Sequence, residues 1–240
     1  MGRPLVSVVI PVYNGERHIA SALQSVFDQD YHPVEVIVVN DGSVDRSADI
    51  VCSYKEIKYI FQANQGPAVA RNVGIEAARG ELVSFLDQDD LWAGQKLSIQ
   101  VDYLLAHPFV GYVLAGERLF LEPGTQRPAW LREELLLKDH TGFLPGTLVV
   151  RIAMFERIGL FDPKYRNSSD LDWLKRARDA GISAGILPDV LLYKRIHSSN
   201  QSREQRGRFE LFEVIKASLD RQRNRREHGT SLRMFNKQWD

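Results

Sequence analysis

The run Val6-Ser7-Val8-Val9-Ile10-Pro11-Val12 decides the fold, because its apolar, largely β-branched residues predict a strand buried on both faces of a parallel sheet. A second run of this kind covers Val34 to Val39. Between the two, apolar residues recur at helical spacing within 16–29 and predict a helix that packs on the sheet. The expected elements that follow are a helix over 44–54 with Ser43 as its N-cap, a strand over 58–61, a helix over 66–78 and a strand over 81–86. This alternation predicts an open, doubly wound α/β sheet.

The second half of the chain has a less regular pattern. It predicts a helix over 96–105, a strand near 111–121, helices near 151–158 and 170–180, and a strand around 190–194. The stretch 122–142 has no clear period. Because long loops in compact domains are commonly lids or binding loops, we expect this stretch to cover a substrate.

Composition excludes several classes of protein. The chain has 31 basic and 31 acidic residues, so no global field attracts nucleic acid, and we expect no nucleic-acid partner. The single cysteine, Cys52, excludes an intramolecular disulfide, and its place in a helical apolar pattern predicts a buried structural thiol. We expect a cytoplasmic protein that does not cross a membrane, because the sequence shows no signal segment and no apolar run of about 20 residues.

The acidic cluster Asp87-Gln88-Asp89-Asp90 directly follows a predicted strand. Three carboxylates within four residues repel one another unless a cation or hydrogen-bond donors compensate them. Oxygen ligands at this density suit Mg²⁺ or Mn²⁺, which bind through one or two carboxylates together with substrate phosphates. The alternative is an acidic cluster that caps the next helix.

Polar segments also follow the first two strands, at 11–14 and at 40–43. Ligands of open parallel sheets bind at the carboxyl ends of the strands, so we expect these segments and the acidic cluster to face one crevice. Asp41 either accepts hydrogen bonds from a ribose hydroxyl or a base N–H, or forms part of an ordinary Asp-Gly-Ser turn.

Three further segments carry candidate residues with open alternatives. The helix expected after Gly66 could turn its N-terminal amides and Arg71 toward a phosphate, or be a capped surface helix. Asp170 and Asp172 begin a helix, where one could act as a general base or both could simply favour the helix dipole. His197 lies in a loop rich in polar donors, where it could bind a metal or a diphosphate, or be solvated.

Taken together, these motifs resemble the family 2 glycosyltransferases of the GT-A fold over roughly residues 5 to 202. Residues 8–14 resemble that family's opening strand and donor loop, and 38–43 resemble its nucleotide-contacting turn. Residues 85–90 resemble its metal-binding DxD segment, and 195–202 resemble an Arg-x-His-x-x-Asn-x-Ser segment of some members.

The resemblance implies roles for individual residues. It places Pro11, Tyr13 and Asp41 around the nucleoside and Arg71 and Asp87 near ribose and diphosphate, with Gly66 and Arg195 also among the donor-binding residues. It places Asp87, Asp89 and His197 at a divalent metal, and Asp170 or Asp172 as the catalytic base. At the base the sequence departs from the family pattern, because Ser169 stands where the family has Glu.

The implied function is metal-dependent, inverting transfer of a sugar from a nucleoside-diphosphate sugar to a hydroxyl of a glycan or lipid-linked acceptor. A nucleotidyltransferase would have a Gly-rich first loop and a dehydrogenase a G-x-G-x-x-G motif, and the sequence has neither. The remaining alternative is a non-catalytic nucleotide-sugar or glycan-binding domain, which Ser169 favours.

We expect one GT-A domain over 1–202, in which 1–115 binds the nucleotide sugar and 116–202 the acceptor, followed by a C-terminal helix and tail over 203–240. Residues 203–226 contain eight basic and four acidic residues. The apolar residues Phe209, Phe212, Ile215 and Leu219 recur there at near-helical spacing. We expect this helix to dock on its own domain, and the alternative is peripheral contact with the inner face of a membrane.

Overall fold

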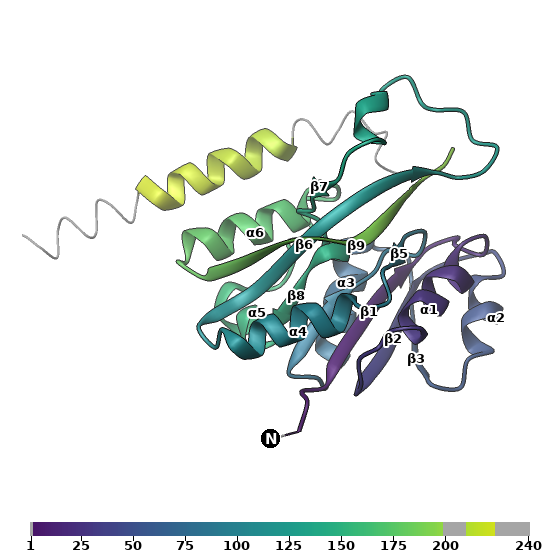
Figure 1. Ribbon diagram of the computed structural model, residues 1–240, viewed down its shortest axis with the longest axis horizontal. Coiled ribbons are helices and arrows are strands. Elements are labelled where there is room, and N and C mark those ends of the chain that lie inside the picture. The colour runs from purple at the N-terminus through teal and green to yellow at the C-terminus, as the bar shows by residue number, and fades with distance from the viewer. Residues whose placement is uncertain (1, 199–209, 224–240) are drawn as a thin grey trace, which may run out of the picture.

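Strand β1 (Val6–Val12) lies in the middle of the parallel half of the sheet and is buried along its whole length. It pairs in parallel with β2 (Val34–Asp41) on one side and with β4 (Leu82–Phe85) on the other. The computed structural model describes residues 2–198 and 210–223, and its sheet has the strand order β3-β2-β1-β4-β8-β6-β9-β5, with β7 paired to β6 (Figure 1). The other strands are β3 (Ile57–Gln62), β5 (Leu91–Trp92), β6 (Val110–Leu121), β7 (His140–Thr141), β8 (Val149–Arg151) and β9 (Ser183–Ile196).

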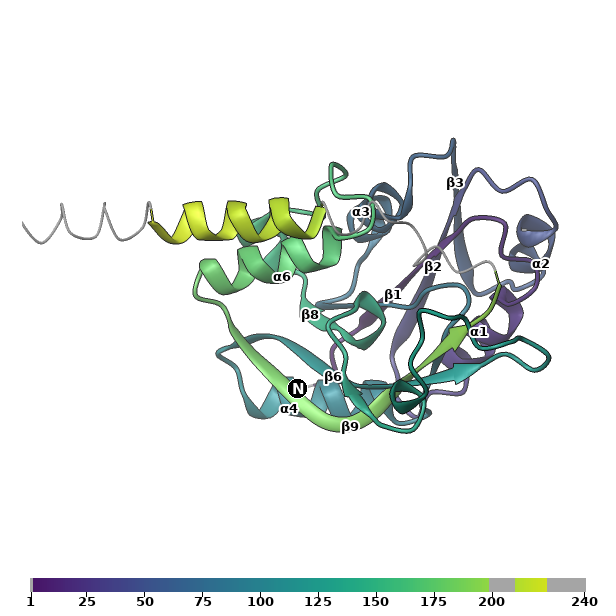
Figure 2. The same cartoon turned by 90° about the horizontal axis from the view of Figure 1, so that it is seen from above.

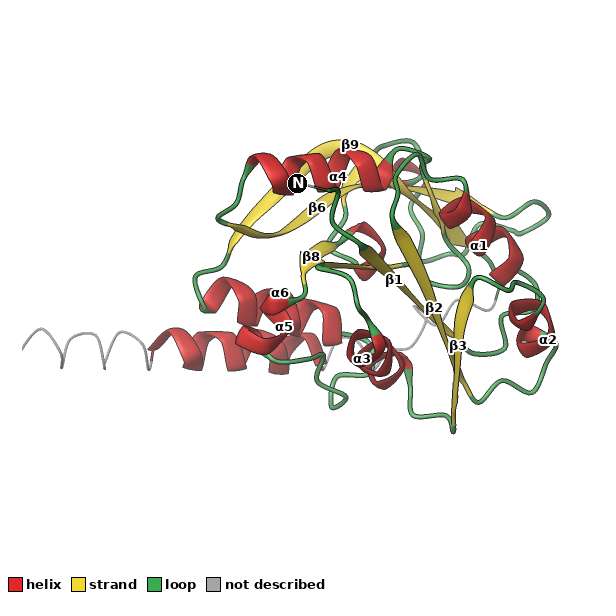
Figure 3. Ribbon diagram, turned by 90° about the horizontal axis from the view of Figure 1, so that it is seen from below, coloured by secondary structure: helices red, strands yellow, loops and turns green. Residues whose placement is uncertain are grey.

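Helices cover both faces of this sheet (Figure 3). They are α1 (Ile19–Phe27), α2 (Ser47–Cys52), α3 (Pro67–Ala77), α4 (Lys96–Ala106), α5 (Ala153–Ile158) and α6 (Ser169–Asp179). Successive residues of a strand point to opposite faces. Val8 and Ile10 therefore pack in the core cluster that holds the buried residues of α1 and α4, while Val9 packs with those of α3, α5 and α6. The doubly wound arrangement predicted from sequence is confirmed.

The second half of the sheet is mixed. β8 runs antiparallel to both β4 and β6, whereas the long strands β6 and β9 are parallel to each other. β5 pairs antiparallel with the end of β9. The stretch between β6 and β7 holds only the short 3₁₀ helix η1 (Glu133–Leu135), and a second one, η2 (Pro145–Thr147), precedes β8. The result is the GT-A type of sheet, mostly parallel and flanked by helices.

Two local predictions are wrong. Ser43 does not cap α2, because that helix begins at Ser47, whose N–H donates to the Asp45 carboxylate at 3.0 Å. The Ser43 hydroxyl instead accepts a hydrogen bond from the Asn14 N–H at 3.0 Å. Cys52 is exposed rather than buried, because the short helix α2 turns the neighbouring Val51 to the core.

The segment 210–223 is helical and lies beside α6 (Figures 1 and 2). The expectation that it docks on its own domain is therefore confirmed for these residues. Phe209 and the predicted boundary after residue 202 lie outside the described residues, and the division into 1–115 and 116–202 stays a prediction. None of the helices in the described part of the chain is long and apolar enough to cross a membrane.

Helix α3 approaches β1 closely at Gly74. A Cβ atom added there would lie 2.2 Å from Val9 Cγ1, and Val9 is fully buried. Although alanine favours helices over glycine, we expect Gly74→Ala to lower the free energy of unfolding, by about 1–3 kcal/mol for an overpacked core. At Gly94 the nearest atom to an added Cβ is 3.7 Å away, so Gly94→Ala is the matched control and should leave stability nearly unchanged. Urea unfolding of both variants measures the difference, and equal stabilities would contradict the close contact.

Candidate active site

A cleft of about 390 Å³ opens at the carboxyl ends of β1, β2 and β4. The predicted site residues that line it are Pro11, Tyr13, Asp41, Gly66, Arg71, Asp87, Asp89 and His197. Lining residues that the sequence analysis did not single out include Asn14, Arg17, His18, Asn64, Gln88, Arg166 and Lys194. The three polar segments expected to share one crevice therefore do so.

The first two carboxylates of the acidic cluster each have a separate partner. Arg71, on α3, donates from Nη2 to Asp87 Oδ1 at 2.6 Å. Asp89 Oδ2 and His197 Nε2 are 2.9 Å apart. Burial alone would raise the pKa of Asp87, but the Arg71 guanidinium and the Lys194 ammonium hold this pKa below its ordinary value.

The third carboxylate, Asp90, is buried against the end of β9. Its Oδ1 accepts from the Arg195 N–H at 2.9 Å, and its Oδ2 lies 3.9 Å from Lys194 Nζ. Burial raises the pKa of Asp90 to about 8, although Lys194 opposes the shift. The capping alternative for the cluster is wrong, because α4 begins only at Lys96.

Strand pairing explains why these groups meet. β5 follows the acidic cluster directly, and its Leu91 pairs antiparallel with Tyr193 of β9. The residues before Leu91 therefore lie opposite the residues after Tyr193, which brings Asp90 beside Lys194. The two-residue strand β5 thus brings Lys194 and Arg195, at the end of β9, into contact with the acidic cluster.

Asp41 organises the wall of the cleft opposite the acidic cluster. Its carboxylate accepts hydrogen bonds from Gln62 Nε2 at 2.6 Å and from the N–H groups of Gln65 and Gly66, both at 2.8 Å. A carboxylate has roughly four acceptor sites, so most of them are used to hold this loop. Asp41 is therefore more than an ordinary turn residue, because it fixes the entry to α3.

Gln88 ties the acidic cluster to the loop after β1. Its Oε1 accepts from the Tyr13 N–H at 2.8 Å, and its Nε2 donates to the Tyr13 carbonyl at 3.0 Å. In the same loop, Asn14 has a positive φ of 48°, and its side chain accepts from the Val44 N–H at 3.0 Å. Gln88 and the Ser43 hydroxyl, which accepts from the Asn14 N–H, thus hold the backbone of this loop from two other loops.

A cluster of ionisable groups closes another side of the cleft. The buried carboxylate of Glu122 lies 3.2 Å from Arg17 and 3.5 Å from His18. The rings of His18 and His197 are 4.9 Å apart. Burial lowers the pKa of His18, and the nearby charge of Arg195 lowers it further. Arg17 and His18 therefore add hydrogen-bond donors to the side of the cleft on which His197 lies.

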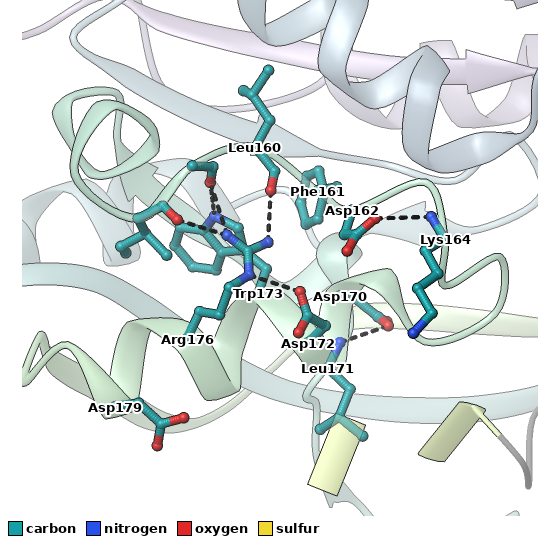
Figure 4. A network of polar contacts seen from close by, with 12 residues as sticks. Leu160, Phe161, Asp162, Lys164, Asp170, Leu171, Asp172, Trp173, Arg176 and Asp179 are labelled. Atoms are coloured by element: carbon teal, nitrogen blue, oxygen red, sulfur yellow. Dashed lines mark hydrogen bonds and ion pairs between the residues drawn. The ribbon is translucent and has the colours of Figure 1, made fainter. Parts of the chain in front are cut away.

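Asp170 and Asp172 have different surroundings (Figure 4). Asp170 lines a small apolar cavity with Trp173 and Phe161, and burial raises its pKa although Arg71 opposes the shift. Asp172 is buried and accepts from Arg176 Nε at 2.7 Å. The Arg176 guanidinium also donates to the carbonyls of Ile158, Gly159 and Leu160. Asp172 therefore has a structural partner, and neither acid is among the residues that line the cleft.

Arg195 also lies away from the cleft lining. Its guanidinium stacks over Phe120, 4.9 Å from the ring centroid, and donates to the Asp89 carbonyl at 2.9 Å. Its neighbour Lys194 lines the cleft instead. Alternation along a strand turns the two side chains to opposite faces, and the sequence alone does not say which of them faces the ligand.

Asp89 Oδ2 and His197 Nε2 lie at hydrogen-bond distance from each other, and both atoms are of the types that bind a divalent cation. Across residues 2–198 and 210–223 no group of three or more His, Cys, Asp or Glu side chains could hold a metal by itself. The remaining ligands would therefore come from water or from phosphate oxygens of a substrate.

Solved structures share this fold. S. aureus TarS 1–349 in complex with UDP-GlcNAc superposes with a TM-score of 0.72 at 23% identity over 90% of this chain and 66% of that one. A mannosyltransferase from Pyrobaculum calidifontis, solved with GDP-Man and Mn²⁺, has a TM-score of 0.65 at 24% identity over 83% of this chain and 59% of that one. The sheet and its flanking helices have the GT-A fold.

Sequence comparisons define the family. The model for glycosyl transferase family 2 matches residues 7–160. An uncharacterized glycosyltransferase of Rickettsia typhi is 32% identical over 225 residues, covering 88% of this chain and 70% of its own length. TuaG of Bacillus subtilis, which its name assigns provisionally to teichuronic acid biosynthesis, is 32% identical over 211 residues, covering 83% of this chain and 82% of its own length. The chain belongs to glycosyltransferase family 2.

The two hydrogen bonds between Gln88 and Tyr13 predict local protection of the loop after β1. Gln88→Ala should speed hydrogen exchange of the Tyr13 amide by about fivefold, which corresponds to the loss of one ordinary hydrogen bond. Gln126→Ala, at an exposed glutamine of the loop after β6, is the control and should leave this amide unchanged. Unchanged exchange in Gln88→Ala would mean that Gln88 does not hold the loop.

Proposed function

We propose that this glycosyltransferase carries out metal-dependent, inverting transfer of a sugar from a nucleoside-diphosphate sugar to an acceptor hydroxyl on a glycan or a lipid-linked carrier. The observation that carries the proposal is the meeting of Asp87, Asp89, His197 and Lys194 at the end of β4, in a cleft that Asp41 closes on the other side. This arrangement offers a polar wall for a nucleoside and concentrated charge for a diphosphate.

The donor would lie across the carboxyl ends of β1, β2 and β4. Pro11, Tyr13 and Asp41 would surround the nucleoside, and Gly66 and Arg71 the ribose and diphosphate. Arg71 supports this placement, because its Nε is buried and has no hydrogen-bond partner among the described residues. A buried donor of this kind is costly unless a ligand satisfies it.

Asp89 and His197 would hold the divalent cation, and Asp87 would share its charge between this site and Arg71. When bound, such a cation offsets the negative charge that develops on the leaving diphosphate. Lys194 and Arg166 line the same cleft and would add positive charge from the protein. The mannosyltransferase neighbour that was solved with GDP-Man and Mn²⁺ is consistent with this chemistry.

Asp170 would act as the general base. Its carboxylate would take the proton of the acceptor hydroxyl, the oxygen would attack the anomeric carbon, and the bond from that carbon to the diphosphate oxygen would break on the opposite face. The raised pKa of Asp170 supports this role, because a base with a pKa nearer neutrality accepts a proton more readily. In this scheme Arg195 would not contact the donor, and it would instead hold the backbone of Asp89 through its hydrogen bond to the Asp89 carbonyl.

Removal of the carboxylate at Asp89 tests the metal site. We expect Asp89→Ala to lower transfer by at least about a hundredfold, because charge stabilisation by a bound metal is worth several kcal/mol. Asp139→Ala removes an exposed carboxylate that pairs with Arg118 and is the matched control with unchanged activity. Release of nucleoside diphosphate from a panel of nucleotide sugars, with Mg²⁺, Mn²⁺ or chelator, measures both variants. Metal-dependent transfer by Asp89→Ala would contradict the proposal.

Substitution of Asp170 should affect transfer, and substitution of Asp172 should affect stability. Asp170→Asn should lower transfer by about 10²–10⁴-fold, the usual share of general base catalysis. Because the pKa of Asp170 is raised in the folded protein, its stabilising contribution is present below the unfolded pKa and is lost as pH rises. Asn imitates the protonated form, so this variant should be at least as stable as the original at neutral pH.

Asp172→Asn should instead lower the free energy of unfolding by about 2 kcal/mol, because it leaves Arg176 without its charged partner. Urea unfolding at pH 4 and pH 7, together with transfer assays, distinguishes the two variants. Loss of transfer in Asp172→Asn without loss of stability would move the base to Asp172. Ser169 favours the alternative of a domain that binds nucleotide sugar without turnover, and calorimetric binding with no transfer to any acceptor would support that alternative.

A further inference from the structure

The C-terminal helical segment 210–223 turns an apolar stripe to solvent. Four side chains form the stripe, with exposed fractions of 40% at Leu211, 72% at Phe212, 40% at Ile215 and 60% at Leu219. A helix that used its apolar side chains to dock on the domain would bury them. Here they are the exposed ones.

The helix is held by a different, largely polar face. Asp179 at the end of α6 accepts from Ser218 Oγ at 3.0 Å, Arg221 Nε at 2.9 Å and Gln222 Nε2 at 2.9 Å. Val214 on the same face is fully buried. The docking therefore fixes the orientation of the helix and leaves the stripe directed away from α6.

The same docking occupies two of the acidic side chains. Glu213 lies 3.1 Å from Lys164 Nζ, and Glu210 accepts from the Asn167 N–H at 2.8 Å. Lys216, in contrast, is exposed and lies four residues after Phe212, so it flanks the stripe. The charge next to the stripe therefore includes the base Lys216 and the exposed acid Asp220.

The position of the helix links it to the cleft. Lys164 and Asn167, which hold its first turns, flank Arg166 in the chain, and Arg166 lines the cleft. A surface that bound the stripe would thus lie near the loop that carries Arg166. It would not need to enter the cleft itself.

We propose that this stripe, Leu211, Phe212, Ile215 and Leu219, docks on the surface of a bilayer that contains anionic lipid. Apolar side chains of an interfacial helix insert at the boundary between headgroups and acyl chains, while flanking basic side chains stay at the level of the headgroups. Lys216, four residues after Phe212 of the stripe, has the place and charge for this contact. The inference does not depend on the reaction proposed for the cleft.

Charge complementarity selects lipid over a second copy of the chain. Symmetric pairing through the stripe would bring together two segments of the same net positive charge. Of the acids near the stripe, Glu210 and Glu213 are bonded to their own domain, and Asp220 is exposed. An anionic bilayer supplies the opposite charge. The sequence of 203–226, with eight basic and four acidic residues, adds to this attraction.

Cosedimentation of the full chain with vesicles tests the proposal. We expect stronger binding to vesicles of phosphatidylcholine with phosphatidylglycerol than to phosphatidylcholine alone. Phe212→Ser and Leu219→Ser should each weaken binding by about tenfold, from the loss of one buried apolar side chain. Lys216→Ala should weaken it by about fivefold on the anionic vesicles. Phe109→Ser removes another exposed phenylalanine, 95% exposed and far from this helix in the sequence, and should have no effect.

Several outcomes would overturn the proposal. They are absence of binding to anionic vesicles, equal binding by Phe212→Ser and the original chain, and an equal loss in Phe109→Ser. Sedimentation velocity without vesicles would identify a second copy as the occupant if Phe212→Ser changed the mass of the particle. Because the substituted side chains are exposed, the variants should keep their fold, which circular dichroism verifies. Donor hydrolysis without vesicles should be unchanged in all of them, so a failure of the proposed reaction remains distinguishable from a failure of docking.

Discussion

The compensation of three carboxylates that follow β4 links distant parts of the sheet. Asp87, Asp89 and Asp90 lie within four residues, and at this spacing they would repel one another strongly in a partly buried site. The structure gives each a different partner, namely Arg71, His197 and the Lys194–Arg195 end of β9. Arg71 comes from α3 and the other partners from the end of β9 and the residue after it, so the acidic cluster joins the parallel half of the sheet to its last strand. The two-residue pairing of β5 with β9 makes this possible.

A consequence is that much of the cleft is organised before any ligand binds. Asp41 is occupied by the loop that leads into α3, and Gln88 by the backbone of Tyr13. Such contacts reduce the reorganisation that binding requires. The buried Nε of Arg71, in contrast, has no hydrogen-bond partner among the described residues. Preorganised charge in a cleft of this kind is the usual basis of catalysis for group transfer to a hydroxyl.

The sequence allows prediction of those parts that depend on local pattern. The run 6–12 and the polar segments after each strand indicate the doubly wound sheet and its ligand-binding edge, because burial and strand direction dictate both. The sequence does not decide which of two neighbouring residues faces the cleft, because this depends on how the strands pair in the folded protein. Whether Lys194 or Arg195 faces the cleft depends on the register of β9, and a shift of one residue would exchange them. The exposure of Cys52 and the start of α2 at Ser47 depend on where a short helix begins, which is the least certain feature of any sequence pattern.

The substitution of Ser169 for the family's Glu can be judged from the surroundings of Asp170. A Glu beside Asp170 would add a like charge and thereby raise the pKa of Asp170. In this chain burial already raises that pKa, while Arg71 limits the shift, and Ser169 is itself buried with no charge to contribute. The property that a base requires, a carboxylate in an apolar setting near a cation, is therefore present without the neighbouring acid. Asp172 cannot replace that acid in the same place, because Arg176 holds its carboxylate against the carbonyls that end α5. The departure from the family pattern therefore removes a charge beside Asp170 without removing the burial that raises its pKa.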